Sequence, residues 1–243
     1  MTSVEKAFLI TASFEGSGYA QVTPNFDGAG LSFGIIQWNF GTGTLHGLIK
    51  AMYKKNPQKF SQLCTVLVDS APYNGKMVDL SKPLLEVCNM TSGAAVQWCK
   101  ARHDGNGRLL SHWVNLFKNL GNDLEFQVIQ RQFAGSYMNT AKKYMSTFGF
   151  KSERALALLY DICVQMGSVG NGSMNRYKAT TTPSMNERDK LIKLAIAMGP
   201  QAGQWERDVR SRKDCIANGF GVVHGRKYDL SKQYGLGDGP ATY

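Results

Sequence analysis

No stretch of the sequence approaches the ~20 consecutive apolar residues that a membrane-spanning helix needs, so we expect no stable membrane insertion. Residues 1–14, MTSVEKAFLITASF, lack the basic start and the apolar length of a secretory signal peptide. There is no low-complexity tract, and 43% of the residues are hydrophobic, which excludes an intrinsically disordered chain. These features predict a globular protein that is synthesised in the cytoplasm.

Patterns typical of metal and nucleotide sites are also missing. The cysteines are odd in number and have no CxxC spacing, and the histidines have no ligand spacing. The glycine-rich segment 219–225 follows an expected helix and lacks the Gly-Lys-Ser/Thr ending of a phosphate loop. We therefore expect buried free thiols, no metal and no cofactor. The residues concerned are Cys64, Cys88, Cys99, Cys163, Cys215, His46, His103, His112 and His224.

Acidic residues are scarce relative to basic ones. The chain has 18 Asp and Glu and 28 Lys and Arg, which gives a net charge of +10. Such a balance favours an anionic partner, which includes nucleic acid, an acidic membrane surface and the bacterial cell wall with its anionic polymers. The longest basic runs are only Lys54-Lys55 and Lys142-Lys143. A nucleic-acid partner is not expected, because no helix or tail concentrates the charge.

The periodicity of the apolar residues predicts a mainly α, α+β protein. Thr2-x-x-Glu5 is a capping box that begins a first helix, and Gly16 would end it. Residues 25–39 predict a small hairpin, and residues 70–83 a loop. We expect one domain over 1–243, with a helical lobe, a hairpin lobe at about 16–43 and a cleft between them. Further helices are expected at 45–55, 57–68, 94–102, 109–120, 124–145, 154–166, 184–198 (with Ser184-x-x-Glu187 as its capping box) and 205–217.

The segment from Phe14 to Thr44 has the composition of a sugar-binding active site. It combines two acids, Glu15 and Asp27, with closely spaced glycines, aromatic rings and amides. Hydrolysis of a glycosidic bond uses one carboxylic acid to protonate the leaving oxygen and one carboxylate to activate water. Glu15 follows a helix, whose negative dipole end disfavours a charge, whereas Asp27 opens an exposed Asp-Gly-Ala-Gly turn. The alternative is a surface glutamate and an ordinary turn aspartate.

The run DGAGLSFGII from Asp27, followed by Gly41-Thr-Gly-Thr44, resembles the hairpin of the family 46 chitosanases. It is also similar to the wider lysozyme superfamily, including phage and secretion-system peptidoglycan hydrolases. The resemblance implies a lysozyme-like fold with Glu15 as the acid, Asp27 as the base and Ser32 orienting the water. The interval between the two acids is shorter than in chitosanases, and Ser32 replaces their threonine. The residues expected to bind substrate are Tyr19, Gly34, Gln37, Trp38 and Asn39.

A buried acid in the helix at 154–166 is a second candidate feature. Asp161 lies in a segment that is apolar nearly all round, where an unpaired carboxylate would be costly. The helix at 205–217 carries Arg207, Arg210 and Arg212. The family 46 resemblance implies a network of a buried aspartate and arginines behind the acid, here Asp161 with Arg210 or Arg212. The alternative is an ordinary core salt bridge.

Together these features predict an inverting muramidase-type glycosidase that cuts β-1,4 bonds of peptidoglycan. Chitosan is a polycation and suits a chain of charge +10 poorly. We expect a monomer that reaches the periplasmic face of the wall through a holin or a secretion system, as an endolysin, phage tail component or effector. The alternatives are a chitosanase, a lytic transglycosylase and a non-catalytic module that binds the wall or another polyanion.

Overall fold

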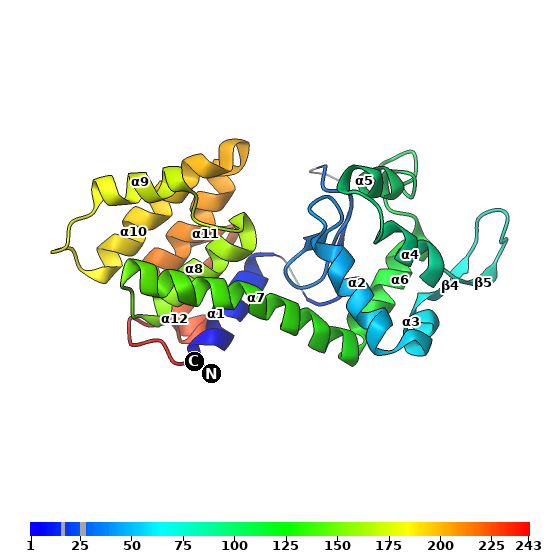
Figure 1. Ribbon diagram of the computed structural model, residues 1–243, viewed down its shortest axis with the longest axis horizontal. Helices are drawn as coiled ribbons and strands as arrows, with labels where there is room; N and C mark the ends of the chain where they lie inside the picture. The colour runs from blue at the N-terminus through cyan, green and yellow to red at the C-terminus, as the bar shows by residue number, and fades with distance from the viewer. Residues whose placement is uncertain (16–17, 25–27) are drawn as a thin grey trace. The chain divides into compact units, whose positions relative to one another are not determined.

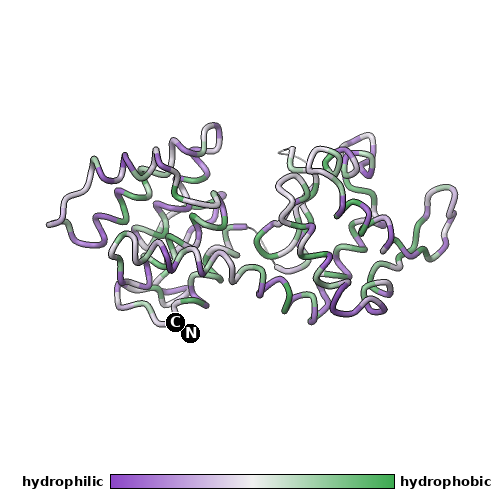
Figure 2. The backbone as a smooth tube through the Cα atoms, viewed as in Figure 1, coloured by the Kyte–Doolittle hydropathy of each residue, from purple (hydrophilic) through white to green (hydrophobic). Residues whose placement is uncertain are grey.

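The computed structural model describes residues 1–15, 18–24 and 28–243. The chain divides into two compact units (Figure 1). Unit 1 is formed by Met1–Phe14 and Gly135–Tyr243, and unit 2 by Glu15–Ala134. The segment predicted as a small lobe, about 16–43, is the first part of unit 2. Hydrophobic stretches run through both units (Figure 2).

Unit 1 is built around one buried helix. Helix α8 is buried on every side from Glu153 to Cys163 because α1 and α11 both pack against it. The helices of unit 1 are α1 (Ser3–Phe14), the second half of α7 (Leu124–Phe148), α8 (Glu153–Met166), α9 (Asn171–Thr180), α10 (Glu187–Met198), the 3-10 helix η1 (Gly199–Trp205), α11 (Glu206–Asn218) and α12 (Leu230–Tyr234). The predicted central helix at 154–166 is thus confirmed.

The beginning of α1 has the predicted capping box. The Thr2 amide donates to Glu5 Oε2 at 2.8 Å, and the Glu5 amide donates to Thr2 Oγ1 at 3.2 Å. The chain ends lie side by side (Figure 1), and the Thr242 amide donates to Ser3 Oγ at 2.9 Å. These contacts fix the start of the helix whose other end carries Glu15.

Thr11 gives a stability prediction for α1. Its side chain is fully buried, and its hydroxyl has no hydrogen-bond partner among the described residues. We expect Thr11→Val to raise the free energy of unfolding by about 1 kcal/mol, because valine has the same shape and no polar group to desolvate. Urea denaturation measures this change. The control is Ser3→Ala on the same helix. The Ser3 hydroxyl is hydrogen-bonded, so its removal should lower the free energy of unfolding. A destabilised Thr11→Val protein would contradict the prediction.

Unit 2 combines short helices with small antiparallel sheets. Strands β1 (Val22–Thr23), β2 (Ser32–Phe33) and β3 (Trp38–Asn39) form one sheet in the order β1-β2-β3, which confirms the predicted hairpin region. The buried ring of Phe33 packs on Phe117 and Phe126, at centroid distances of 5.0 and 5.9 Å. The other elements are α2 (Thr44–Lys55), α3 (Pro57–Cys64), β4 (Thr65–Val68), β5 (Lys76–Asp79), α4 (Ser81–Val87), α5 (Ser92–Lys100), α6 (Ser111–Asn122) and the first half of α7.

Two hairpins were not predicted from the sequence. The helix predicted at 57–68 ends at Cys64, and the segment 70–83, predicted as a loop, contains β5, which pairs with β4. Val66 and Val68 are buried while Leu67 is exposed, an alternation typical of a strand with one covered face. The glycine-rich segment 219–225 lies mostly in a hairpin of β6 (Phe220–Val223) and β7 (Arg226–Asp229). His224 and Gly225 form its turn at positive φ.

Candidate active site

The end of α1 is held in place immediately before Glu15. Phe14 is 1% exposed, and Tyr228 meets its ring edge-on at a centroid distance of 4.9 Å. The Tyr228 hydroxyl donates to the carbonyl of Ser13 at 3.0 Å. Glu15 follows directly and is partly buried. The candidate acid therefore leaves the helix from a rigid point, next to carbonyls at its negative dipole end.

The partner acid predicted for Glu15, Asp27, lies outside the described residues. Ser32 is central in its sheet, opposite Thr23 of β1 and Asn39 of β3, and is 8% exposed. Its predicted role in orienting water stays a prediction. Gly30 and Gly34 on either side of Ser32 both adopt positive φ, which places turns before and after β2.

Trp38 differs from its predicted role. Its indole is 3% exposed and packs against Gly34, so it has no free face on which a sugar could stack. The reason is the alternation along β3, which turns Trp38 to the core and leaves Asn39 partly exposed. Gly34 is itself buried, and a side chain there would meet Gln130 Oε1 at 2.5 Å. Trp38 and Gly34 therefore pack inside the hairpin region and contribute to its shape.

The predicted polar contacts to substrate are occupied by the protein itself. Gln37 accepts from Thr23 Oγ1 at 2.6 Å and donates to the Gly34 carbonyl at 2.9 Å. Asn39 Oδ1 accepts from the amide and the hydroxyl of Thr42, at 2.8 and 2.9 Å, and so fixes the Gly41–Thr44 turn. These bonds define the shape of the hairpin loops, and any contact with a sugar would have to be shared with them.

Tyr19 and Gln130 connect the start of unit 2 to α7. The Tyr19 hydroxyl accepts from Arg131 Nη1 at 2.9 Å, and the guanidinium carbon of Arg131 lies 5.5 Å from the ring centroid. Gln130, fully buried, donates to the Tyr19 carbonyl at 2.9 Å and accepts from the Ile35 amide at 3.1 Å. Gln130 was not predicted. Its signal in the sequence is a polar residue beside Phe126, Ile129 and Phe133 on the apolar face of α7.

The buried acid of unit 1 has the predicted arginine and one unpredicted lysine as partners. Arg212 Nη2 lies 2.6 Å from Asp161 Oδ1, and the ammonium of Lys213 donates to Asp161 Oδ2. All three side chains are at most 3% exposed. Burial alone would raise the pKa of Asp161, but the charges and hydrogen bonds of Arg212 and Lys213 outweigh it and lower the pKa to about 2. We call these three residues the buried triad.

Arg210 is not part of this network, contrary to the prediction. It pairs with Asp214, one turn further along α11, at 2.8 Å, on a half-exposed side of the helix. Val209, Arg212, Lys213 and Ile216 have the i, i+3, i+4, i+7 spacing of the face that is buried in unit 1. That spacing is the signal in the sequence that distinguishes Arg212 and Lys213 from Arg210.

The buried triad reaches the end of α1. The guanidinium carbon of Arg212 lies 5.5 Å from the ring centroid of Phe14, the residue before Glu15. The triad and the helix end thus belong to one packed cluster in unit 1. Its role toward Glu15 stays a prediction.

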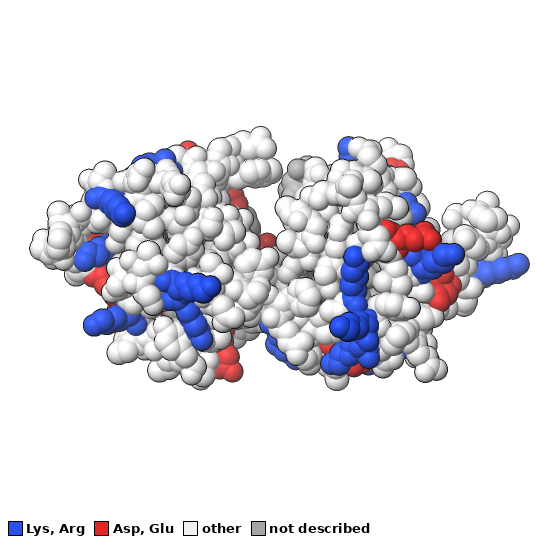
Figure 3. Space-filling model, in the orientation of Figure 1, with Lys and Arg blue, Asp and Glu red and all other residues white. Residues whose placement is uncertain are grey.

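Lys and Arg side chains outnumber Asp and Glu on the face shown in Figure 3. Lys50, Lys54 and Lys55 of α2 in unit 2 are exposed. The described residues include no group of three His, Cys, Asp or Glu side chains placed to hold a metal ion. All five cysteines are buried free thiols, as predicted. No described helix is long and apolar enough to cross a membrane.

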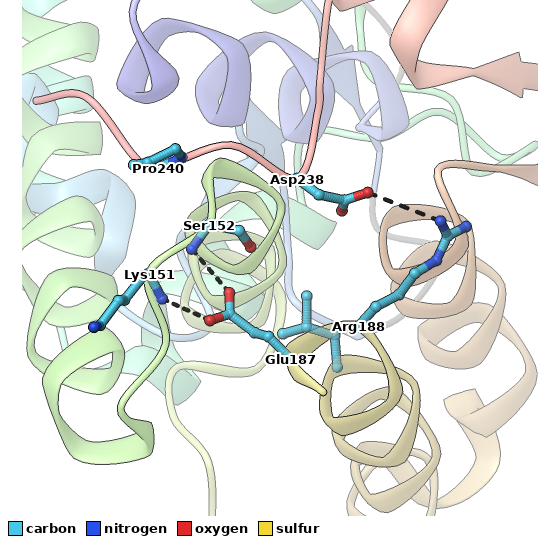
Figure 4. Close-up of a pocket in the computed structure, with 7 residues that line it drawn as sticks. Lys151, Ser152, Glu187, Arg188, Asp238 and Pro240 are labelled. Atoms are coloured by element: carbon cyan, nitrogen blue, oxygen red, sulfur yellow. Dashed lines mark hydrogen bonds and ion pairs between the residues drawn. The ribbon is translucent and has the colours of Figure 1, made fainter. Parts of the chain in front are cut away.

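A small cavity of about 180 Å³ lies in unit 1 beside the start of α10 (Figure 4). Its acids already have partners. Glu187 accepts from the amides of Lys151 and Ser152, at 2.9 and 2.8 Å, and Asp238 pairs with Arg154 and Arg188. The cavity therefore has no free acid and base for glycosidic chemistry.

Comparisons with known proteins support the fold. No protein-family model matches the sequence, and no curated protein matches it either. Among solved structures, a chitosanase from Bacillus subtilis MY002 is 20% identical, with a TM-score of 0.65 over 94% of this chain and 95% of that one. A GH46 chitosanase from Gynuella sunshinyii in complex with chitotetraose is 14% identical, with a TM-score of 0.64 over 93% and 96%. The chain therefore has the mainly α, lysozyme-like fold of the chitosanases, as its hairpin motif predicts.

Proposed function

We propose that this protein is a glycosidase that cuts β-1,4 bonds in an amino-sugar polymer, and that its substrate is the glycan of peptidoglycan. The observation that carries the proposal is the location of Glu15. In a chain with the chitosanase fold along nearly its whole length, this acid directly follows a helix end that packs on a buried ion cluster. General acids need such fixed placement, because small displacements reduce proton transfer to the leaving oxygen.

Charge supports peptidoglycan over chitosan as the substrate. The solved chitosanase structures include complexes with 6 GlcN and with chitotetraose. Glucosamine polymers carry ammonium groups, which a protein of charge +10 repels, whereas walls carry anionic polymers that attract it. In the proposed mechanism Glu15 protonates the leaving oxygen, while Asp27 and Ser32 hold the attacking water. The protein would act on the periplasmic side of the wall after release through a holin or a secretion system.

The test is cleavage of defined substrates. Purified sacculi, chitosan and chitin are each incubated with the protein, and the products are analysed by mass spectrometry. Muropeptides with reducing ends from sacculi support the proposal. Products from chitosan alone would instead support a chitosanase, and binding to sacculi without products a non-catalytic module.

The water-activating role of Asp27 gives a separate prediction. We expect Asp27→Asn to abolish turnover but to keep glycan binding, because an amide cannot accept the proton of the water. Ser32→Ala should reduce turnover less, since it removes one contact to that water. Inverting acids stand roughly 6.5–9.5 Å apart to leave room for water. Turnover rates, with NMR of the fresh product, measure this. An active Asp27→Asn protein would contradict the water-activating role, and an anhydro-muramic product would indicate a lytic transglycosylase.

Salt should weaken binding to the wall. Attraction between the basic surface and anionic polymers is screened over ~10 Å at 0.1 M salt. We expect the fraction of protein that sediments with sacculi to fall as sodium chloride rises, and lysis to fall with it. A matched control is the variant Lys50→Gln, Lys54→Gln, Lys55→Gln in α2, which should show a weaker dependence on salt. Binding that is unchanged up to high salt would contradict the proposal.

A further inference from the structure

The β6–β7 hairpin of unit 1 has one face packed on α11 and one face open to solvent. On the inner face Val223 is buried, and a side chain at Gly221 would meet Cys215 of α11 at 3.0 Å. On the outer face Phe220 is 65% exposed and Val222 is 54% exposed. Because successive residues of a strand point to opposite faces, these two apolar side chains of β6 are neighbours on the outer face.

Basic side chains border this apolar pair. The register of the hairpin puts Lys227 directly opposite Val222, on the same face, and Arg226 beside it at the turn; both basic residues are exposed. The acid of that face, Asp229, is already paired with Lys232 at 3.1 Å. The apolar surface is therefore next to cations whose charge is not cancelled on the same face. We call this set the hairpin patch: Phe220, Val222, Arg226 and Lys227.

The hairpin patch stands on a fixed support. Val223 and Tyr228 of the inner face are 1% and 5% exposed. The Tyr228 hydroxyl donates to the carbonyl of Ser13 at 3.0 Å, and in the turn His224 Nε2 lies 2.5 Å from Asp208 Oδ1. A surface that is held in place before it binds loses less conformational entropy on binding.

The β4–β5 hairpin of unit 2 has comparable apolar side chains but the opposite charge. Leu67 and Met77 are directly opposite each other and are 48% and 63% exposed. The next pair on that face is Thr65 and Asp79, so this face carries an acid in place of a base. Of the two exposed hairpin faces, the one in unit 1 is thus complementary to an anionic surface.

The size of the hairpin patch favours a lipid surface over a protein partner. Each strand has four residues and is roughly 14 Å long at ~3.4 Å per residue. A stable protein interface covers about 800 Å² on each side, which a two-stranded ribbon of this length cannot supply. Contact with a bilayer needs only apolar side chains that enter the headgroup boundary and basic side chains that meet the phosphates.

We propose that the hairpin patch is a membrane-contact site, which binds the surface of an anionic phospholipid bilayer reversibly and without spanning it. Phe220 and Val222 enter the boundary between headgroups and acyl chains, while Arg226 and Lys227 pair with lipid phosphates. The inference goes beyond the proposed function and does not depend on it, because none of these four residues belongs to the proposed catalytic machinery.

The test is sedimentation with vesicles of phosphatidylglycerol and phosphatidylethanolamine in equal parts, compared with vesicles of phosphatidylcholine alone. We expect the protein to bind the anionic vesicles and not the neutral ones, and less strongly as sodium chloride rises. Phe220→Ser together with Val222→Ser should weaken binding about tenfold, because the apolar contact is lost. Arg226→Gln and Lys227→Gln should each weaken it about fivefold.

The matched control is Leu67→Ser together with Met77→Ser in the β4–β5 hairpin, which should leave vesicle binding unchanged. Every substituted side chain is exposed, so all variants should fold, and urea denaturation verifies this. Purified sacculi contain no lipid, so the Phe220→Ser, Val222→Ser variant should bind them as the wild type does. This comparison separates lipid phosphates from the anionic polymers of the wall.

Three results would overturn the proposal. The wild type sediments with neither kind of vesicle, or the folded Phe220→Ser, Val222→Ser variant binds anionic vesicles as well as the wild type does. The third is a dimer in analytical ultracentrifugation that this variant abolishes, without vesicle binding, which would assign the hairpin patch to a second copy of the chain. Cleavage of sacculi is measured separately, so a failure of the proposed function would leave this inference standing.

Discussion

Glu15→Gln should abolish glycan cleavage, with kcat at least ~10²–10⁴-fold below the wild type, the contribution that general acid catalysis typically makes. Glutamine keeps the shape of the side chain, but its amide protons are not acidic and cannot be transferred to the leaving oxygen. Because Phe14 and Tyr228 hold the helix end, the fold of unit 1 should be unaffected. Release of soluble muropeptides from sacculi measures the rate.

The matched control is Glu5→Gln on the same helix. Glu5 accepts from the Thr2 amide in the first turn of α1, and glutamine can still do so, so the change removes only a favourable charge at the helix N-terminus and should cost a few tenths to about 1 kcal/mol of stability and no activity. A folded Glu15→Gln protein that lyses permeabilised Gram-negative cells at a near-normal rate would remove Glu15 from the mechanism. Loss of activity in both variants would point to damage to α1 as a whole.

Asp161→Asn should be strongly destabilising, by about 3–5 kcal/mol, because it removes the fully buried carboxylate charge that both Arg212 and Lys213 contact. The asparagine fills the same space, so the loss reports on charge and not on packing. Urea denaturation at pH 7 measures it. The control is Asp214→Asn, which removes the half-exposed partner of Arg210 and should cost only about 0.3–0.5 kcal/mol. Similar losses in both variants would contradict the buried-triad account.

We also expect the effect of Asp161→Asn on the free energy of unfolding to depend on pH. The pKa of Asp161 is lowered from 3.8 to about 2 in the folded protein by Arg212 and Lys213. A group with a lowered folded-state pKa stabilises the protein above its unfolded pKa and loses that contribution as the pH falls through its folded pKa. The difference in unfolding free energy between wild type and Asp161→Asn should thus be constant above about pH 4–5 and shrink toward pH 2. A constant difference down to pH 2 would contradict this assignment.

The local pattern of the sequence was sufficient for most of the helices and for one buried contact, but it did not predict α4, α9 or α12. The capping box at Thr2, the all-apolar helix around Asp161 and the glycine-bounded strand at Phe33 are each encoded within a few residues, so spacing alone predicts them. The need of a buried carboxylate for a cation predicted the pairing of Asp161 with an arginine. The predicted end of the first helix located Glu15 directly after it.

Only the tertiary structure decided which side chains meet. The choice of Arg212 over Arg210, and the addition of Lys213, depend on which face of α11 packs on α8. The burial of Trp38 depends on how β3 sits against Gly34 and its neighbours, and the β4–β5 hairpin on pairing between segments that spacing alone did not mark as strands. The β4–β5 hairpin pairs two separate segments, and periodicity within one segment carries no information on such pairing. The spacing of Val209, Arg212, Lys213 and Ile216 marks one face of α11, but it does not say which element packs on that face. The sequence by itself determined most of the helices, the basic charge and the position of the candidate acid; packing between the helices determined which side chains lie behind the end of α1.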